Sequence, residues 1–222
     1  CGPQDETRTF PNTRYVESYD GVRVVVPDHP KRILALSSAY DTILLGLIEP
    51  DRLVGINKLS TYPEYSMEAE RAKLVKPVMS SYPLEKIIAL NPDLVIAPDY
   101  TTVDVIEGLR HMGIPTVVVA GGSTVEGVIK NITDIANIVG EPEKGQFYDT
   151  KIRREMDELK RVMEFNHSIG LPVTLAEMNL KADQVPQLVK GAMDTNEYRT
   201  TPFDPDKYAA AILTVDRLGQ AL

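Results

Sequence analysis

The chain of 222 residues has no tryptophan, one cysteine and three histidines, and aromatic residues make up 6% of it. A single cysteine, Cys1, cannot form an internal disulfide, and no histidine or acid stands beside it to make it a nucleophile. No two of the histidines, His29, His111 and His167, have the spacing of metal ligands, so each is assigned a surface or packing role. The sequence therefore predicts no catalytic residue, no metal site and no cofactor.

Positive charge and long apolar runs are also missing. The formal net charge is −8, and the densest basic group is balanced by the acids that follow it, as on a solvated helix face: Lys151, Arg153 and Arg154 against Glu155, Asp157 and Glu158. Phosphate binding needs clustered Lys and Arg, so a nucleic-acid partner is excluded. No segment approaches the ~18 apolar residues that a membrane-spanning helix needs.

The first residues resemble the start of a mature bacterial lipoprotein, in which the leading cysteine carries lipid. The segment from Gly2 to Thr13 is polar and suits a flexible tether between a membrane and a folded domain. This predicts lipidation of Cys1, membrane contact through that anchor, and an extracytoplasmic or periplasmic location. The alternative is a chain that merely happens to begin at a cysteine.

Short apolar runs alternate with amphipathic segments along most of the chain. Strands are expected at 22–27, 32–36, 53–56, 93–97 and 116–120, and helices at 40–47, 84–90, 102–112 and 125–139, the last capped by Ser123 or Thr124. This alternation predicts an α/β fold in which helices flank a parallel sheet. The expected organisation is a tether (1–19), an α/β lobe (20–140), a long helix (141–165) and an all-helical tail (166–222). Within the tail, Val173–Leu175 could form a strand, residues 200–205 a turn and residues 206–218 a closing helix.

Ligands of parallel sheets bind beyond the carboxyl ends of the strands. The candidate ligand-binding residues in the loops at these ends are hydroxyls, phenols and glycines: Ser37, Ser38, Tyr40, Ser81, Tyr82, Tyr100, Gly121 and Gly122. They suit a bulky, partly aromatic ligand, but they do not combine a nucleophile, a base and an orienting acid. Each set also has a structural alternative: packing for the tyrosines, helix capping for the serines and a turn for the glycines.

Several phrases resemble the periplasmic-binding-protein family that captures iron siderophores, haem and cobalamin. The most specific runs from Leu84 to Ile96 (LEKIIALNPDLVI), and Val25–Leu36, Met112–Val119 and Ile129–Gly140 occur in the family's order. The resemblance covers residues 20 to 158. It implies one lobe of a two-lobed receptor that holds a metal chelate and delivers it to an ABC permease in the membrane. The shortage of histidine favours a metal already wrapped in a chelate over a bare ion.

The tail, about residues 160 to 222, resembles the C-terminal end of glycerol dehydrogenases in two phrases, Phe165–Met178 and Thr201–Leu213. The chain is therefore interpreted as a chimera, from a fused gene, a recombination or engineering. Dehydrogenase activity is not expected, because Gly121-Gly122-Ser123-Thr124 lacks the nucleotide-binding glycine spacing. The alternative to a ligand-binding module is a structural fusion without a ligand. The oligomeric state is left open.

Overall fold

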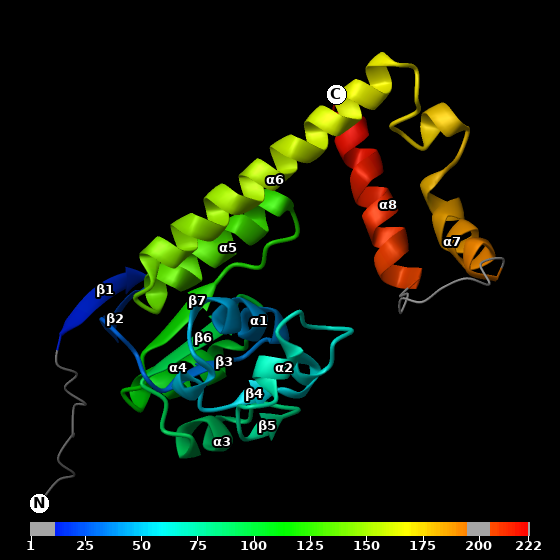
Figure 1. The fold of residues 1–222 in the computed structure, drawn as a ribbon. Helices are drawn as coiled ribbons and strands as arrows, with labels where there is room; N and C mark the ends of the chain where they lie inside the picture. Colours follow the sequence, from blue (N-terminus) through cyan, green and yellow to red (C-terminus); the bar gives the residue numbers. More distant parts are fainter. Residues whose placement is uncertain (1–11, 195–204, 222) are drawn as a thin grey trace, which may run out of the picture. The chain divides into compact units, whose positions relative to one another are not determined.

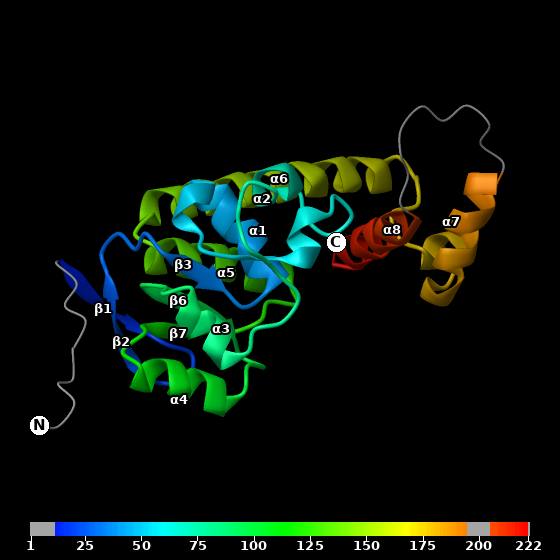
Figure 2. The same ribbon diagram turned by 90° about the horizontal axis from the view of Figure 1, so that it is seen from below.

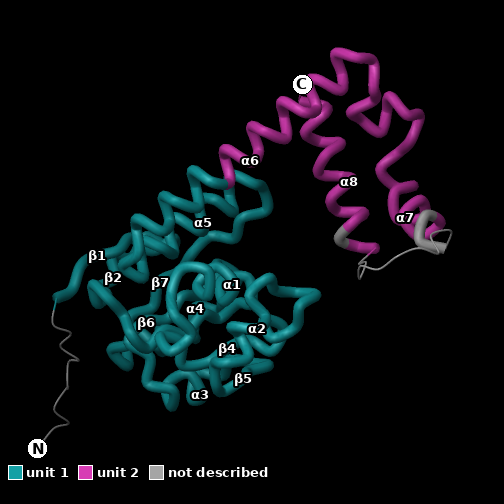
Figure 3. The backbone as a smooth tube through the Cα atoms, in the orientation of Figure 1, with its two compact units in different colours: residues 1–151 teal, residues 152–222 magenta. Residues whose placement is uncertain are grey.

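A computed structural model describes residues 12–194 and 205–221. The chain divides into two compact units, residues 1–151 and 152–222 (Figure 3). The first unit is an α/β lobe, and the second is a small helical unit. The long helix α6, Pro142–Ser168, contributes residues to both (Figure 1).

The lobe is built on short parallel strands. β3 (Ile33–Ala35), β6 (Leu94–Pro98) and β7 (Thr116–Val119) form a parallel sheet in the order β3-β6-β7. β4 (Ile56–Asn57) and β5 (Val78–Met79) form a second parallel pair. A parallel bridge between Ile33 and Leu53 attaches this pair to the free edge of β3.

Helices follow the strands, as parallel connections require. They are α1 (Ser38–Leu47) after β3, α3 (Leu84–Ala89) after β5, α4 (Val103–His111) after β6 and α5 (Val125–Ile138) after β7. Three short elements connect α1 to β5: the 3₁₀ helix η1 (Pro50–Arg52), the 3₁₀ helix η2 (Lys58–Thr61) and α2 (Ala69–Ala72).

Two hydrophobic cores lie on the two faces of the sheet. Along β6, Leu94 and Ile96 enter the core that includes α1 and α5, whereas Val95 and Ala97 enter the core that includes α3 and α4. Successive strand side chains point to opposite faces, so one buried run serves both cores. Figure 2 shows α1 and α5 on one side of the sheet and α3 and α4 on the other.

The turn before β6, part of the phrase LEKIIALNPDLVI, has a structural role. The carboxylate of Asp93 accepts hydrogen bonds from the backbone N–H groups of Lys31 (2.8 Å) and Arg32 (2.9 Å). The Arg32 guanidinium in turn donates to the carbonyl oxygens of Leu90 and Asn91. Asn91 has a φ of 49°, a left-handed conformation that asparagine tolerates. These contacts fix the start of β3 beside β6.

A β-hairpin precedes the sheet. β1 (Thr13–Glu17) pairs antiparallel with β2 (Arg23–Pro27). The hairpin is tied to the lobe at the end of α5, where the guanidinium of Arg14 donates to the carbonyl oxygen of Ile138 (2.8 Å). The sequence predicted a tether over residues 1–19, but Thr13–Glu17 of this segment form β1. The polar segment is ordered as a strand because its backbone groups pair with those of β2.

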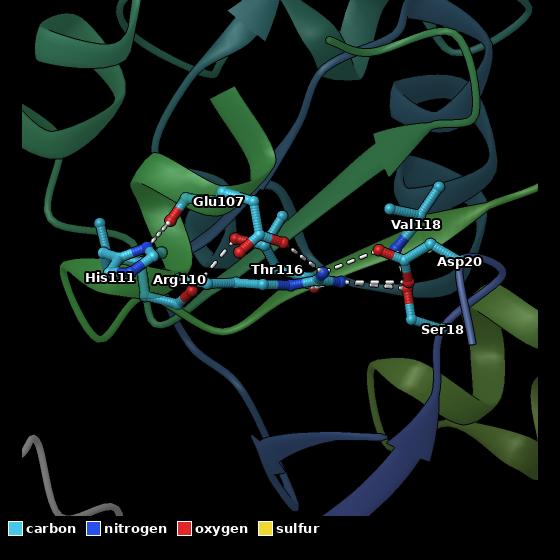
Figure 4. A network of polar contacts seen from close by, with 8 residues as sticks. Ser18, Asp20, Glu107, Arg110, His111, Thr116 and Val118 are labelled. Carbon is cyan, nitrogen blue, oxygen red and sulfur yellow. Dashed lines mark hydrogen bonds and ion pairs between the residues drawn. The ribbon is translucent and has the colours of Figure 1, made fainter. Parts of the chain in front are cut away.

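A polar network holds the turn of this hairpin against α4 and β7 (Figure 4). Arg110 on α4 contacts the carboxylate of Asp20, the hydroxyl of Ser18 and the carbonyl oxygen of Thr116. The Ser18 hydroxyl also accepts the backbone N–H of Val118 on the outer edge of β7 (2.8 Å). The network thereby satisfies an otherwise unpaired strand edge.

The second unit consists of the end of α6, the 3₁₀ helices η3 (Ala176–Met178) and η4 (Ala182–Gln184), and helices α7 (Val185–Asp194) and α8 (Pro205–Gly219). Its small core is entirely aliphatic: Leu175, Val185, Val189 and Ala209, with Leu180, Ile212 and Leu213 packed against them.

The predicted strand at Val173–Leu175 is wrong. Side-chain carboxylates occupy its backbone N–H groups: Glu177 Oε2 accepts from Val173 and Thr174, and Asp216 Oδ1 accepts from Leu175 (2.6 Å). The segment therefore forms a polar turn instead of joining a sheet. The backbone N–H groups of Val173 and Thr174 also hold the pKa of the Glu177 carboxyl below its usual value.

The predicted fold class is confirmed: helices flank a parallel sheet, followed by a long helix and a small helical segment. The long helix ends at Ser168, three residues beyond the prediction. Cys1 and most of the turn predicted at residues 200–205 lie outside the described residues. None of the helices in residues 12–194 and 205–221 is long and apolar enough to cross a bilayer.

Candidate ligand-binding site

The predicted site residues lie in loops and helix starts that follow the strands, and two of them make hydrogen bonds to residues that follow or end other strands. The Tyr40 hydroxyl, on α1 after β3, donates to the carbonyl oxygen of Val119 at the end of β7 (2.9 Å). The backbone N–H of Gly121, after β7, donates to Asp99 Oδ2, after β6 (3.3 Å). The loops that follow three different strands therefore meet at one place, as parallel strands predict.

Tyr40 and Tyr100 differ sharply in exposure. Tyr40 is 3% exposed, and burial, together with the charges of Asp99 and Tyr100, raises its pKa to about 12. Tyr40 is thus a packing residue that braces β7, which corrects its assignment as a ligand contact. Tyr100 is 76% exposed and close enough to influence Tyr40. The Tyr100 ring is therefore accessible to a ligand at the carboxyl edge of the sheet.

Tyr82 lies half-buried between β5 and α3. Its hydroxyl accepts a hydrogen bond from Asn57 Nδ2 (3.1 Å), at the end of β4. Burial raises the pKa of Tyr82, and the nearby groups Asp41 and Tyr100 raise it further. Tyr82 therefore stays protonated and can offer a hydroxyl and a ring edge to a ligand.

The serines and glycines were predicted either to contact the ligand or to have a structural role, and the structure shows a structural role for Gly122. Ser37 occupies the N-cap position of α1 but its side chain makes no capping bond, and Ser38 begins the helix. Ser81 is exposed beside Tyr82. Gly122 has a steric role, because a Cβ there would lie 2.5 Å from the backbone carbon of Gly127 in α5. Gly122 thus permits the close approach of this loop to the helix.

A buried acid that was not predicted from the sequence lies behind these residues. Asp41, next to Tyr40 on α1, has no exposed surface. Its Oδ2 accepts hydrogen bonds from the backbone N–H of Asn57 and from the hydroxyl of Ser60, both at 2.8 Å. Its other oxygen, Oδ1, is buried without a hydrogen-bond partner among the described residues. Burial raises the pKa of Asp41 to about 7, although the two hydrogen bonds act in the opposite direction.

Asn57 connects this acid to the tyrosine. Its backbone N–H goes to Asp41, its side-chain N–H to Tyr82, and its Oδ1 accepts the backbone N–H of Leu59, which caps η2. A sequence signal existed for Asp41: it is a charged residue at helical spacing from the buried Leu44 and Leu45.

Two cavities lie away from these residues. One, of about 400 Å³, is a groove among the end of β1, β7 and α5, with Ser18, Val118 and Asn131 in its walls. The other, of about 320 Å³, is an apolar hollow in the helical unit, beside Met163, Leu175 and Tyr208. Neither contains a predicted binding residue. Across the part of the chain that the structure describes, no cluster of three or more His, Cys, Asp and Glu could hold a metal ion.

Comparison with known proteins gives a consistent picture. The family model described as "Periplasmic binding protein" matches residues 33–165. A vitamin B12-binding protein of Vibrio campbellii is 32% identical over 148 residues, covering 66% of this chain and 52% of that protein. An uncharacterized ABC transporter substrate-binding lipoprotein of Bacillus subtilis is 27% identical over 164 residues, covering 72% of this chain and 49% of that protein.

Solved structures agree with these relatives. A crystal structure of the haem-binding protein HmuT superposes with a TM-score of 0.56 at 27% identity, covering 73% of this chain and 52% of that one. The chain therefore spans about half the length of the relatives it matches. Because the family model matches more than half of its residues, and does so over the strands and helices of the lobe, the chain belongs to the periplasmic binding protein family.

Proposed function

We propose that this chain is a substrate-binding component of an ABC importer and that it binds a metal chelate at the carboxyl edge of its sheet. The observation that carries this proposal is the convergence of Tyr82, Tyr100 and the Gly121 loop at that edge. Phenol rings, hydroxyls and backbone groups suit a large, partly flat ligand whose metal is already coordinated. The role is binding, without catalysis.

Cobalamin is the first candidate chelate. Relatives named as vitamin B12-binding or cobalamin-binding proteins occur in Vibrio and in Halobacterium salinarum. Haem is the second, since the haem-binding protein HmuT has a similar fold at 27% identity. A ferric siderophore is the third, from the resemblance in sequence. All three present an organic surface around the metal.

Calorimetric titration of the whole chain with cyanocobalamin, haemin and a ferric siderophore tests the proposal. Saturable binding of one compound with a dissociation constant in the micromolar range or tighter is expected. Calorimetry is preferable to tyrosine emission because these chelates absorb ultraviolet light strongly. A folded protein that binds none of the three would contradict the proposal and favour a structural fusion without a ligand.

A matched pair of variants tests the position of the site. Tyr100→Ala removes a ring that is 76% exposed at the carboxyl edge, and Tyr15→Ala removes one that is 65% exposed on the β1–β2 hairpin. Only the first is expected to weaken binding, by about tenfold if the ring contacts the ligand over one face. Equal effects of the two would place the ligand elsewhere.

The partner and the location follow from the same proposal. Delivery to a membrane permease requires an extracytoplasmic position, and one relative is named a substrate-binding lipoprotein. We propose that Cys1 carries the lipid. Metabolic labelling with a fatty-acid analogue, in cells that express the chain behind a lipoprotein signal peptide, should label the protein, and Cys1→Ser should abolish the label. Label that survives Cys1→Ser would refute the anchor.

The tail is a separate question. Its resemblance to the end of glycerol dehydrogenases supports an origin different from that of the lobe, and we propose that the chain is chimeric. The helical unit has its own aliphatic core and is proposed to serve as structure only. Incubation of the chain with glycerol, NAD⁺ and zinc should give no NADH; formation of NADH would overturn this reading.

A further inference from the structure

Asp41 is built into the lobe in an unusual way. A carboxyl group with no exposed surface and one unpartnered oxygen is costly to bury, so its presence in the core needs a reason. An apolar side chain at this position of α1 would not carry the cost of burying a carboxyl group. The hydrogen bonds of Asp41 supply the reason, because both reach across to the segment that follows β4.

That segment leads directly to the carboxyl edge. Asp41 Oδ2 fixes the backbone of Asn57, the N-cap residue of η2, and the side chain of Ser60, which lies within η2. Asn57 then holds the hydroxyl of Tyr82 at 3.1 Å. One buried oxygen thus sets two anchor points, and through Asn57 it sets the position of a ring that borders the proposed site.

We infer that Asp41 is a positioning residue for ligand binding, acting through Asn57 on Tyr82. This inference rests on the proposed function for its effect on a ligand, but its effect on Asn57 and Tyr82 can be measured without one. Asp41 itself has no exposed surface, so it contacts no ligand in this conformation.

The protonation state of Asp41 should tune this positioning. An ionised carboxylate accepts two charge-assisted hydrogen bonds, whereas the neutral acid accepts weaker ones. Since burial raises the pKa of Asp41 to about 7, the contact should tighten between pH 6 and pH 8. Affinity for a ligand that touches Tyr82 is therefore expected to rise several-fold over that range.

Several charged groups on the elements around α1 already have partners of their own or are exposed. Arg71 on α2 pairs with Glu49 and Glu68, and Lys130 on α5 pairs with Asp134. Lys58 on η2 is exposed. Asp99 and Tyr100, after β6, act on Tyr40, and Tyr100 also acts on Tyr82. The pKa of Asp41 is set by its burial and by its bonds to Asn57 and Ser60, and the charge of Asp41 in turn raises the pKa of Tyr82.

Nuclear magnetic resonance of the full chain tests the positioning without a ligand. In a titration from pH 5 to pH 9, the amide signal of Asn57 and the ring signals of Tyr82 should move with one common midpoint near 7. Asp41→Asn keeps an acceptor oxygen but cannot ionise, so both movements should vanish. The control Thr42→Val removes another polar contact of α1, to Ser66 (2.8 Å), and should leave them unchanged.

Ligand affinity is measured on the same proteins with cyanocobalamin, or with whichever of haemin and the ferric siderophore binds. Asp41→Leu should bind at least tenfold more weakly than the wild type at pH 8, and Asp41→Asn should show no pH dependence. If the Asn57 and Tyr82 resonance signals move with pH in the same way in the wild type and in Asp41→Asn, the inference is overturned. Failure of all three compounds to bind would instead refute the proposed function, while the magnetic resonance result would still decide the positioning role.

Discussion

The guanidinium group of Arg110 holds the carboxylate of Asp20 through two contacts, Nη1–Oδ2 at 2.7 Å and Nη2–Oδ1 at 3.2 Å. This pair joins the turn of the β1–β2 hairpin to α4, which lies 90 residues later in the chain. Only 14% of the Arg110 side chain and 33% of the Asp20 side chain are exposed. Water and salt therefore screen the Arg110–Asp20 ion pair less than they screen an ion pair on the open surface.

Replacement of Arg110 by lysine is expected to lower the free energy of unfolding by about 1–3 kcal/mol, because an ammonium group cannot make the paired contact and also reach Thr116. Urea unfolding measures the loss. The control is Glu17→Gln, which breaks an ion pair with Arg23 whose partners are 70% and 67% exposed. That change should cost less than ~0.5 kcal/mol; equal costs would show that the Arg110 network is only a surface feature.

The buried acid predicts an unusual pH dependence of stability. The pKa of Asp41 rises from 3.8 to about 7 on folding, so between these values the folded state keeps a proton that the unfolded state has lost. Stability from this group is therefore highest below pH 4 and falls as the pH rises to 7, by up to about 4 kcal/mol. Urea unfolding from pH 4 to pH 8 should show a steeper decline for the wild type than for Asp41→Asn. Parallel curves would contradict the prediction.

Two glycines with left-handed backbones allow the cost of backbone strain to be measured separately from the cost of steric crowding. Gly140 has a φ of 80°, and a Cβ there would lie 2.1 Å from the carbonyl oxygen of Asp28; Gly113 has a φ of 70° and nothing within 4 Å. Gly113→Ala should cost about 1–2 kcal/mol from backbone strain alone. Gly140→Ala should cost at least about 3 kcal/mol or prevent folding, since the backbone must also move. Thermal unfolding distinguishes them, and similar melting temperatures would be the contrary result.

The cap of α5 provides a test of the loop that carries Gly121 and Gly122. The Thr124 hydroxyl oxygen accepts the backbone N–H of Gly127 at 3.0 Å. Thr124→Ala should lower the free energy of unfolding by about 1 kcal/mol, whereas Thr124→Ser, which keeps the acceptor, should be nearly neutral. If serine costs as much as alanine, the cap is not the source of the stability.

The alternation of strands and helices could be predicted from the sequence because each element buries enough apolar residues to show its own period. The run at β6, Leu94–Pro98, is buried throughout, and a strand was expected at residues 93–97. The N-cap at Thr124 was expected as one of two candidates. Such features depend on neighbours within a few residues, which a single sequence displays.

The rest depends on contacts between distant segments. Asp41 reads as an ordinary polar residue of a helix until Asn57 and Ser60, 16 and 19 residues later, come to lie against it. The hydrogen bond from Tyr40 to Val119 joins residues 79 apart, so the sequence could not decide between packing and binding for this ring. Val173–Leu175 failed as a strand because Asp216, on a helix 41 residues away, takes one of its donors.

The short stretch at Ile138–Glu141 has a consequence for synthesis of the chain. It receives Arg14 at Ile138 and Arg52 at Val139 and Glu141, contacts that span 124, 87 and 89 residues. A ribosome makes the amino-terminal end first, so both arginines leave the exit tunnel long before their partners exist. The lobe therefore gains these contacts only after every strand of its main sheet has been made. Until the α5–α6 junction emerges, the hairpin is held by the Arg110 network, and the nascent chain lacks the three contacts that Arg14 and Arg52 make.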